Sequence, residues 1–219
     1  MLIRDCMTRH PVLAPLSMRA AEAQALMTEN NIRHLPVVGD GKRLAGLITR
    51  ERLAVKADML GSLNVWEISR YLSDQRVRDL MVKANDLITI SPDRTVERAA
   101  AMMTEHKIGC LPVVEDGDLV VGIVTESDLL HSYQEMLGLP SAGVRVTVRM
   151  PNRHGEFVKL MAVLVAQNWG VMGIGTFPTR RDPDSYDAVI KIPNVTIEDV
   201  QRALSTVPNQ AIVDIRAAV

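Results

Sequence analysis

An internal repeat constrains the fold of this chain more than any other feature of its sequence. Three blocks recur in the same order: IRDCM (Ile3–Met7) with VRDLM, IRHLPVV with IGCLPVV, and GLITRERL with GIVTESDL (Gly122–Leu129). The second and third pairs are 76 residues apart and the first pair is 74 apart, so one two-residue insertion near residues 84–86 aligns all three. Three ordered blocks at one spacing indicate a duplication. The first 134 residues therefore contain two copies of one small α/β unit.

Each copy has the same expected order of elements, βαββα. A short apolar strand ends in a turn that contains proline, and a helix follows with apolar residues at helical spacing. Its expected N-cap is Ser17 in the first copy and Ser91 or Asp93 in the second. In the first copy, Ala21, Ala25 and Leu26 are expected to face inward.

A hairpin and a second helix complete each copy. The LPVV strand is followed by an Asp-Gly turn, a common hairpin signal, and by a second apolar strand. Thr49 and Thr125 end these second strands and are good helix N-caps, with acidic residues in the turn that follows each of them.

Residues 143–219 have a different pattern. VRVTVRM (Val144–Met150) alternates apolar and polar residues, which predicts a half-buried strand. The next segment predicts a helix, whose apolar face is formed by Phe157, Leu160, Met161, Leu164 and Val165. Two strands, a helix capped by Thr196 and a last strand follow. The order βαββαβ is that of a ferredoxin-like unit.

The predicted fold class is thus mixed α+β, with two βαββα repeats packed as a pseudo-twofold pair and a separate βαββαβ domain. The expected divisions are repeat 1 at 1–54, a linker helix at 55–76, repeat 2 at 77–134, a linker at 135–142 and the last domain at 143–219.

Composition narrows the classes of function. The net charge of −1 and the 3% of aromatic residues argue against a nucleic-acid-binding protein. The N-terminus lacks the apolar stretch of a signal peptide, and no run is long enough to span a membrane. We therefore expect a cytoplasmic protein without membrane contact. The only cysteines, Cys6 and Cys110, lack the spacing of a metal site, and the five histidines give no metal signal.

The repeated pattern LPVV…GhhTxx, where h is apolar, resembles a known family. Residues 1–134 resemble a tandem pair of cystathionine-β-synthase (CBS) domains, the arrangement called a Bateman module. Residues 143–219 resemble an ACT domain through the strand, glycine turn and helix in MPNRHGEFVKLMAVLVAQNWGV. The whole arrangement is similar to CBS–ACT regulatory proteins, including those linked to acetoin utilisation.

The resemblance implies a cleft between the repeats that binds an adenosyl ligand: AMP, ADP, ATP, S-adenosylmethionine or NAD. It implies no covalent cofactor. A carboxylate shortly after the second strand can accept hydrogen bonds from both ribose hydroxyls, and the free N–H groups of a helix start can face a phosphate. The expected nucleotide-binding residues are Thr89, Ile90, Ile108, Gly109, Cys110, Leu111, Pro112, Thr125, Ser127, Asp128, Arg50 and Arg52. Arg33 and His34 fit either phosphate contacts or ordinary loop residues.

One position differs between the copies in a way that matters for this chemistry. Repeat 2 carries Thr125 and Asp128, whereas repeat 1 carries Thr49 and Arg52. Arginine has only donors and cannot accept hydrogen bonds from a ribose. We therefore expect nucleotide binding at Asp128 and no equivalent binding at Arg52. Arg50 or Arg52 could instead reach the phosphates of the ligand at Asp128.

For the last domain, the resemblance implies an amino-acid ligand near the loop after the first strand, formed by Asn152, His154, Gly155 and Glu156. Asn152 stands near the place where the family usually has an acid, so a domain used only for dimerisation or interdomain contact is the alternative. A homodimer is expected, since exposed sheet edges and helix faces tend to find partners.

Taken together, these features predict a non-enzymatic sensor that relays nucleotide occupancy to the last domain or to a partner. Two alternatives stay open: a scaffold with an empty cleft, and an enzyme that processes the nucleotide. The second would need a general base, and the nearby Glu126, Asp128 and His131 all have structural explanations.

Overall fold

The computed structural model of the chain describes residues 1–54, 75–179 and 182–218, and forms two compact units, Met1–Leu129 and Leu130–Val219. The expected linker helix at 55–76 lies almost wholly outside the described residues.

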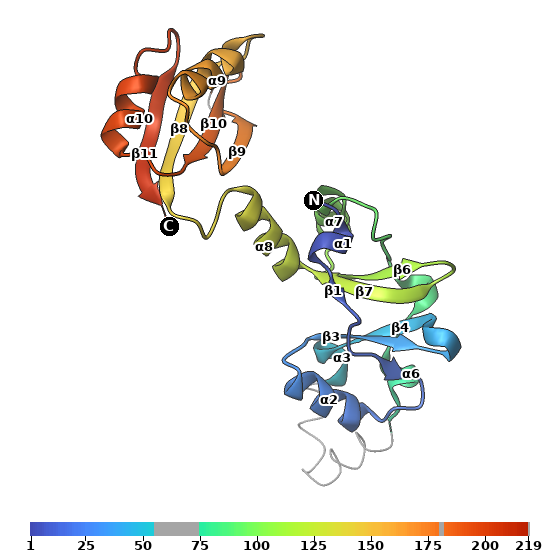
Figure 1. Cartoon of the computed structure of the whole chain (residues 1–219). Coiled ribbons are helices and arrows are strands. Elements are labelled where there is room, and N and C mark those ends of the chain that lie inside the picture. Colours follow the sequence, from blue (N-terminus) through green and yellow to red (C-terminus); the bar gives the residue numbers. More distant parts are fainter. Residues whose placement is uncertain (55–74, 180–181, 219) are drawn as a thin grey trace, which may run out of the picture. The chain divides into compact units, whose positions relative to one another are not determined.

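Most of repeat 1, from residue 20 to residue 53, lies in the lower half of the first unit in Figure 1, whereas residues 3–9 lie beside repeat 2 in the upper half. Its elements are α1 (Ile3–Cys6), β1 (Thr8–Arg9), β2 (Ala14–Pro15), α2 (Ala20–Glu29), β3 (His34–Val38), the 3₁₀ turn η1 (Asp40–Lys42), β4 (Leu44–Thr49) and α3 (Arg50–Leu53). Helix α2 packs Ala20, Ala23 and Met27 onto the sheet, with Leu26 partly buried beside them as expected, whereas Ala21 and Ala25 are exposed. Its N-cap is Arg19 and not the expected Ser17.

Repeat 2 has the matching elements. They are α6 (Val77–Leu80), β5 (Val82–Lys83), the 3₁₀ turn η2 (Ala84–Asp86), α7 (Val96–His106), β6 (Cys110–Glu115), β7 (Leu119–Thr125) and α8 (Glu126–Met136). Helix α7 buries Val96, Ala99 and Met103, which are spaced for one helical face. Thr95 caps this helix by accepting a hydrogen bond from the Arg98 N–H, so the expectation of Ser91 or Asp93 is wrong.

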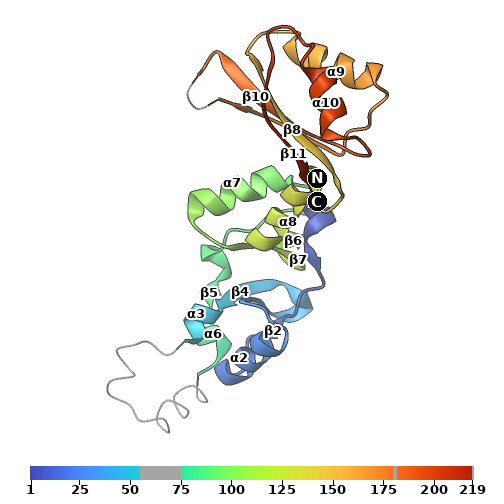
Figure 2. The ribbon, with the colours of Figure 1, turned by 90° about the vertical axis from the view of Figure 1, so that its left-hand side faces the viewer.

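The two repeats exchange their N-terminal segments. Strand β1 pairs with β7 of repeat 2, giving a sheet in the order β1-β7-β6, and β5 pairs with β4 of repeat 1, giving β2-β3-β4-β5. The helices follow the same exchange: Ile3 N–H donates to Arg94 O at 2.8 Å, and Val77 N–H donates to Met18 O at 2.9 Å. The two sheets meet in the middle of the unit (Figures 1 and 2).

Residues 143–218 form an antiparallel sheet covered on one face by two helices (Figure 1). The elements are β8 (Gly143–Pro151), α9 (Glu156–Ala166), β9 (Gly173–Pro178), β10 (Ser185–Ile192), α10 (Ile197–Leu204) and β11 (Ala211–Ala218). The sheet order β11-β8-β10-β9 and the chain order βαββαβ confirm the ferredoxin-like topology. Leu160 and Leu164 enter the core as expected, whereas Val165 is exposed.

Candidate functional site

Two cavities lie between the repeats of the first unit. The first, here named the Asp128 pocket, has a volume of about 340 Å³ and is lined by Thr8, His10, Pro11, Val12, Asn31, Ile32, Arg33, His34, Ile123, Thr125, Ser127 and Asp128. The second, the Glu51 pocket, has a volume of about 560 Å³ and is lined by Arg33, His34, Leu47, Thr49, Glu51, Val82, Asp86, Leu87, Ile88, His106, Ile108, Gly109, Cys110, Pro112 and Glu126. Both volumes fall in the range of small-molecule sites.

The duplication relates the two pockets. Thr125 and Ser127 of the Asp128 pocket correspond to Thr49 and Glu51 of the other, at the same 76-residue offset. Each pocket combines the helix start of one repeat with the loops of the other. The exchange of N-terminal segments explains this, because β1 pairs with β7 and leads directly into His10, which lines the Asp128 pocket.

Asp128 lies in the first turn of α8 and is held there by Thr125. Its Oδ2 accepts hydrogen bonds from the backbone N–H and the hydroxyl of Thr125, both at 2.7 Å. The Asp128 N–H donates back to the hydroxyl of Thr125 at 3.4 Å. This reciprocal cap fixes the carboxylate at the wall of the pocket.

The corresponding turn of repeat 1 is built differently. Arg52 does not line the described part of either pocket, and its guanidinium donates to the carbonyl of Leu80 at 3.2 Å. The carboxylate that interacts with the Thr49 hydroxyl is that of Glu51, whose pKa is lowered by hydrogen bonds to its own backbone N–H and to Thr49. Repeat 1 therefore keeps an acid at its helix start, one position earlier than repeat 2.

The expected binding residues divide into three groups. Thr125, Ser127 and Asp128 line the Asp128 pocket; Ile108, Gly109, Cys110 and Pro112 line the Glu51 pocket; and Thr89, Ile90, Leu111, Arg50 and Arg52 line neither within the described chain. Ile90 and Leu111 are buried in the core, and Arg50 donates to the Ile32 carbonyl.

Apart from Arg33 and His34, sequence reasoning missed the repeat 1 residues of the Asp128 pocket. His10, Pro11 and Val12 come from the loop between β1 and β2, and Ile32 comes from the loop between α2 and β3. The available signal was the duplication itself, because applying the 76-residue offset to Ile108 gives Ile32.

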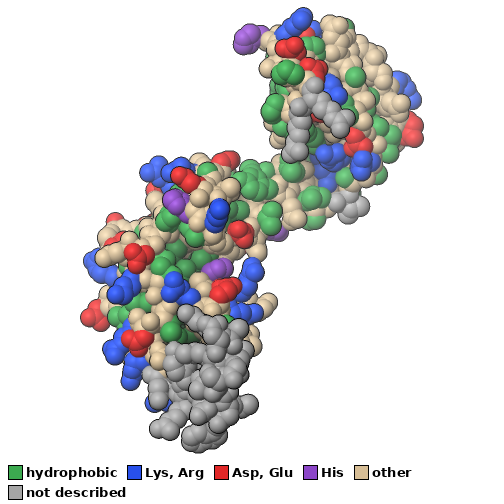
Figure 3. Space-filling view, turned by 180° about the vertical axis from the view of Figure 1, so that it is seen from behind, with side chains coloured by type: hydrophobic (Ala, Val, Ile, Leu, Met, Phe, Trp, Pro, Cys, Tyr) green, Lys and Arg blue, Asp and Glu red, His purple; other side chains and the backbone are tan. Residues whose placement is uncertain are grey.

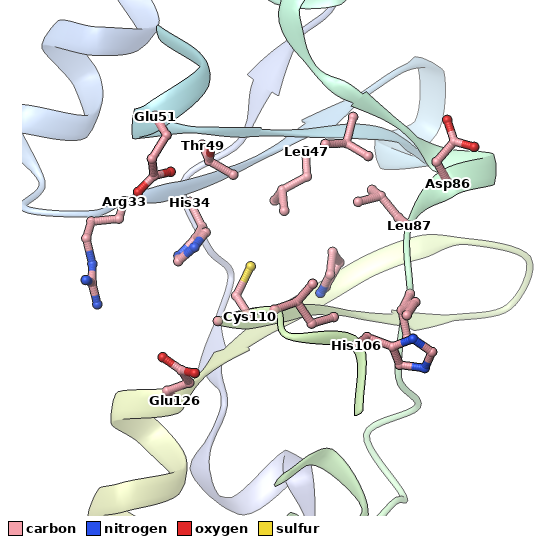
Figure 4. A pocket seen from close by; sticks show the side chains of 15 residues that line it. Arg33, His34, Leu47, Thr49, Glu51, Asp86, Leu87, His106, Cys110 and Glu126 are labelled. Atoms are coloured by element: carbon pink, nitrogen blue, oxygen red, sulfur yellow. The ribbon is translucent and has the colours of Figure 1, made fainter. Parts of the chain in front are cut away.

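Ionisable groups converge on the Glu51 pocket (Figure 4). Burial is the main cause that raises the pKa of the Cys110 thiol to about 12, and the charges of Glu126 and Glu51 add to it. Burial also lowers the pKa of His34, assisted by the charge of Arg33. Cys110 is therefore a neutral thiol at neutral pH, which argues against a nucleophilic role.

The expected ligand loop of the last domain is mostly exposed. Asn152, His154 and Gly155 are exposed, and Glu156 is buried. The Glu156 carboxylate accepts from Lys159 Nζ at 2.6 Å and from Gln210 Nε2 at 3.3 Å, which ties this acid to the domain's own residues. An amino-acid ligand at this loop remains a prediction.

The described residues offer neither a metal-binding cluster nor a membrane-spanning helix. Within these, we find no cluster of three or more His, Cys, Asp or Glu that could hold a metal ion. In the same residues, every helix is too short or too polar to span a bilayer. On the face shown in Figure 3, acidic and basic side chains are interspersed over the first unit.

Comparison with solved structures gives two informative neighbours. The CBS domain pair of protein MJ0100, in complex with 5′-methylthioadenosine and S-adenosyl-L-methionine, is 28% identical, with a TM-score of 0.50, and the match covers 61% of this chain and 95% of that one. A putative acetoin utilization protein (AcuB) from Vibrio cholerae is 32% identical, with a TM-score of 0.52, and the match covers 64% of this chain and 94% of that one.

Curated relatives include much longer proteins. L-Aspartate semialdehyde sulfurtransferase from Methanocaldococcus jannaschii is 29% identical over 132 residues, which are 60% of this chain and 23% of the relative. Homoserine O-acetyltransferase from Methanocorpusculum labreanum is 32% identical over 139 residues, 63% of this chain and 25% of the relative. The match thus spans about a quarter of the length of these relatives.

The family profile described as CBS domain matches residues 3–56 and 77–135, which together make up more than half of the chain. These ranges contain the duplicated blocks and the helix starts at Thr49 and Thr125. The chain therefore belongs to the CBS-domain family.

Proposed function

We propose that the chain is a regulatory sensor that binds an adenosyl ligand in the Asp128 pocket. The observation that carries the proposal is the Asp128 carboxylate, held by Thr125 at the pocket wall. A ribose offers two neighbouring hydroxyl donors, and an ionised carboxylate can accept both in charge-assisted hydrogen bonds. The ligands named in the MJ0100 complex, 5′-methylthioadenosine and S-adenosyl-L-methionine, both contain this ribose, which supports the proposal.

Capping of the helix and binding of a ligand are compatible roles for Asp128. A carboxylate has about four acceptor positions, so the hydrogen bonds that Thr125 donates to Oδ2 and those of a ribose can share one carboxylate. A ligand held by Asp128 also lies at the N-terminal end of α8, where backbone N–H groups and the helix dipole favour negative charge.

Helix α8 is the natural element to relay occupancy. It begins at the Asp128 pocket, and the division between the two compact units falls within it, after Leu129. We propose that residues 143–219 form an ACT domain that receives this signal, on the basis of their βαββαβ order and sheet order. A relay requires that the ligand bind two states of the chain with different affinity.

A sensor without catalytic activity fits the chemistry of the cleft best. The high pKa of Cys110 gives the Glu51 pocket no thiolate nucleophile. The relatives with enzyme names are about four times longer than the matched segment, so their activities do not transfer to these residues.

We also propose a homodimer. Strands β9 and β11 form the two edges of the second unit's sheet, and edges with accessible backbone groups favour pairing with another chain. Val165, on α9, is 77% exposed, and Phe177, on β9, is 47% exposed. Light scattering at micromolar concentration should give twice the monomer mass, and a monomer mass would refute the dimer.

The sensor proposal is tested by a thermal-shift panel of AMP, ADP, ATP, NAD, NADH and S-adenosylmethionine. A ligand at 100 times its Kd adds about 2.7 kcal/mol to the stability of the state that binds it. We expect at least one compound to raise the melting temperature of the wild type, and Asp128→Asn to abolish that shift.

The chain contains a matched control for this variant. Thr196 and Asp199 form the same reciprocal cap at α10, with the Thr196 hydroxyl at 2.7 Å from Asp199 Oδ2, outside both pockets. Asp199→Asn should therefore lose a similar cap but keep the full ligand shift. Equal loss in both variants would contradict the role of Asp128, and no shift with any compound would contradict the proposal as a whole and favour an empty scaffold.

A further inference from the structure

The pseudo-symmetry of the two pockets is broken at a second position, besides that of Asp128 and Arg52. Arg33 and His34 of repeat 1 line both pockets, whereas their counterparts Gly109 and Cys110 line only the Glu51 pocket. At this position, only repeat 1 contributes residues to the wall that the two pockets share.

Arg33 is the only arginine or lysine among the described residues that line either pocket. Its backbone is anchored, because its carbonyl accepts a hydrogen bond from the Arg50 N–H at 3.0 Å, while the residue is exposed. An anchored backbone with an exposed, long side chain allows the guanidinium to turn toward either pocket. Figure 4 shows it beside His34, between Glu51 and Glu126.

The repeat 2 counterpart of Arg33 is Gly109, which has no side chain to contribute to either pocket. A Cβ placed there would lie 3.4 Å from Glu126 Oε2 and 3.8 Å from His34 Cε1. Both are ordinary van der Waals distances, so Gly109 faces Glu126 and His34 at the place where the counterpart of the Arg33 side chain would begin. Repeat 2 supplies no second guanidinium, and one cation serves two pockets.

The two pockets also differ in the number of carboxylates that line them. The Glu51 pocket contains three carboxylates, Glu51, Asp86 and Glu126, whereas Asp128 is the only one in the described lining of the other pocket. Without Arg33, the Glu51 pocket keeps its acids and has no permanently charged cation among the described residues. Such a pocket disfavours a phosphate, because like charges repel at short range.

We propose that Arg33 is shared by the two pockets, so that a phosphorylated ligand in one weakens the binding of a second phosphorylated ligand in the other. The inference rests on the proposed function, that these pockets hold adenosyl ligands. It predicts that the pair accepts one nucleotide together with one uncharged nucleoside more readily than two nucleotides.

Two histidines report on the pockets separately. His10 lines only the Asp128 pocket and His106 lines only the Glu51 pocket, while His131 and His154 line neither and serve as references. Titration of the full chain with AMP, and separately with adenosine, is followed through the imidazole NMR signals. Each titration gives a ratio between the half-saturation concentrations of the weaker and the stronger pocket.

In the wild type, the ratio for AMP should exceed the ratio for adenosine by about tenfold or more, the effect of one lost charge-assisted hydrogen bond. In Arg33→Ala the two ratios should become equal. Arg33→Lys, which keeps a cation, should retain part of the difference. Arg98→Ala removes an exposed charge from α7 that lines neither pocket and should behave as the wild type.

Each other outcome is decisive. Equal ratios in the wild type, or an unchanged ratio for AMP in Arg33→Ala, would overturn the sharing of Arg33. A response of His10 alone to both compounds would also overturn it, while the proposed function would stand. A response of His106 alone, or of neither histidine, would contradict the proposed function as well.

Discussion

The Asp128 pocket and the Glu51 pocket began as copies and differ in where they place one carboxylate. In repeat 2, the acid lies three residues after Thr125 and closes a reciprocal cap at the start of α8. In repeat 1, the acid that contacts the corresponding Thr49 lies two residues after it, and Arg52 turns away to the Leu80 carbonyl. Both copies thus keep an acid at the helix start, but only one keeps it at the position expected for ribose recognition.

The largest expected difference between the two repeats is in stability, and it concerns their exchanged N-terminal segments rather than the pockets. A Cβ on Gly46 would lie 2.5 Å from the Val82 carbonyl oxygen, a backbone atom of β5. A Cβ on Gly122 would lie 3.1 Å from the corresponding carbonyl of Thr8, and its 2.5 Å contact is with the flexible Met7 side chain. Gly46→Ala should therefore destabilise the first unit by about 3 kcal/mol and Gly122→Ala by about 1 kcal/mol.

Calorimetric unfolding of the full chain would measure both values. An equal cost for the two glycines would show that the two exchanged segments do not approach their sheets differently.

Exchanging the helix-start residues should convert one pocket toward the other. Glu51→Ser combined with Arg52→Asp gives repeat 1 the acid position of repeat 2. The new carboxylate could accept ribose hydroxyls, so adenosine affinity in the Glu51 pocket should rise about tenfold. The His106 NMR signal measures this pocket, and His10 is the control. An unchanged His106 titration would mean that the acid position does not explain the difference.

Deletion of the two threonine hydroxyls compares the capping of the two corresponding helices, α3 and α8. Thr125 accepts a helix N–H bond, whereas the side chain of Thr49 caps no N–H of α3. Thr125→Ala should destabilise its helix by about 1 kcal/mol, and Thr49→Ala should cost less. Hydrogen exchange of the amides in α3 and α8 would compare them, and a larger loss in α3 would contradict the assignment.

The smallest effect is on the titration of His34. Burial, and then the charge of Arg33, hold its pKa below the ordinary value of 6.5. Because the folded state disfavours protonation, the stability of the first unit should fall as the pH drops through 6.5 toward the lowered pKa. Arg33→Ala should raise the pKa of His34 without restoring the ordinary value, since burial is the larger cause. An NMR titration that shows the same His34 pKa in Arg33→Ala would mean that Arg33 lies too far from His34 to lower its pKa.

The duplication made the elements of the first unit predictable, but not their partners. The spacing of the repeated blocks located Thr49, Thr125 and the hairpins from sequence alone. The pairing of β1 with β7 is a tertiary contact between segments more than 100 residues apart, and no local pattern encodes it. The sequence therefore predicts one nucleotide site that contains both Ile108 and Asp128, whereas the structure places these residues in different pockets.

The N-cap of α7 is a second feature that a tertiary contact decides and that the local sequence does not predict. Ser91 and Asp93 are good N-caps by residue type, but the carbonyls of Pro92 and Arg94 accept hydrogen bonds from the N-terminal segment of repeat 1. That docking keeps the preceding residues outside the helix and leaves Thr95 as the cap. Residue type favoured Ser91 and Asp93, whereas docking of the exchanged segment leaves Thr95, which was not among these candidates, as the cap.

The central claim is that the Asp128 carboxylate recognises the ribose of an adenosyl ligand. The most direct test is a crystal structure of the full chain with AMP. Both ribose hydroxyls should lie within hydrogen-bond distance of the Asp128 carboxylate, in the pocket lined by Pro11, Val12 and Thr125. AMP with its ribose directed away from Asp128, or bound only in the Glu51 pocket, would contradict the account.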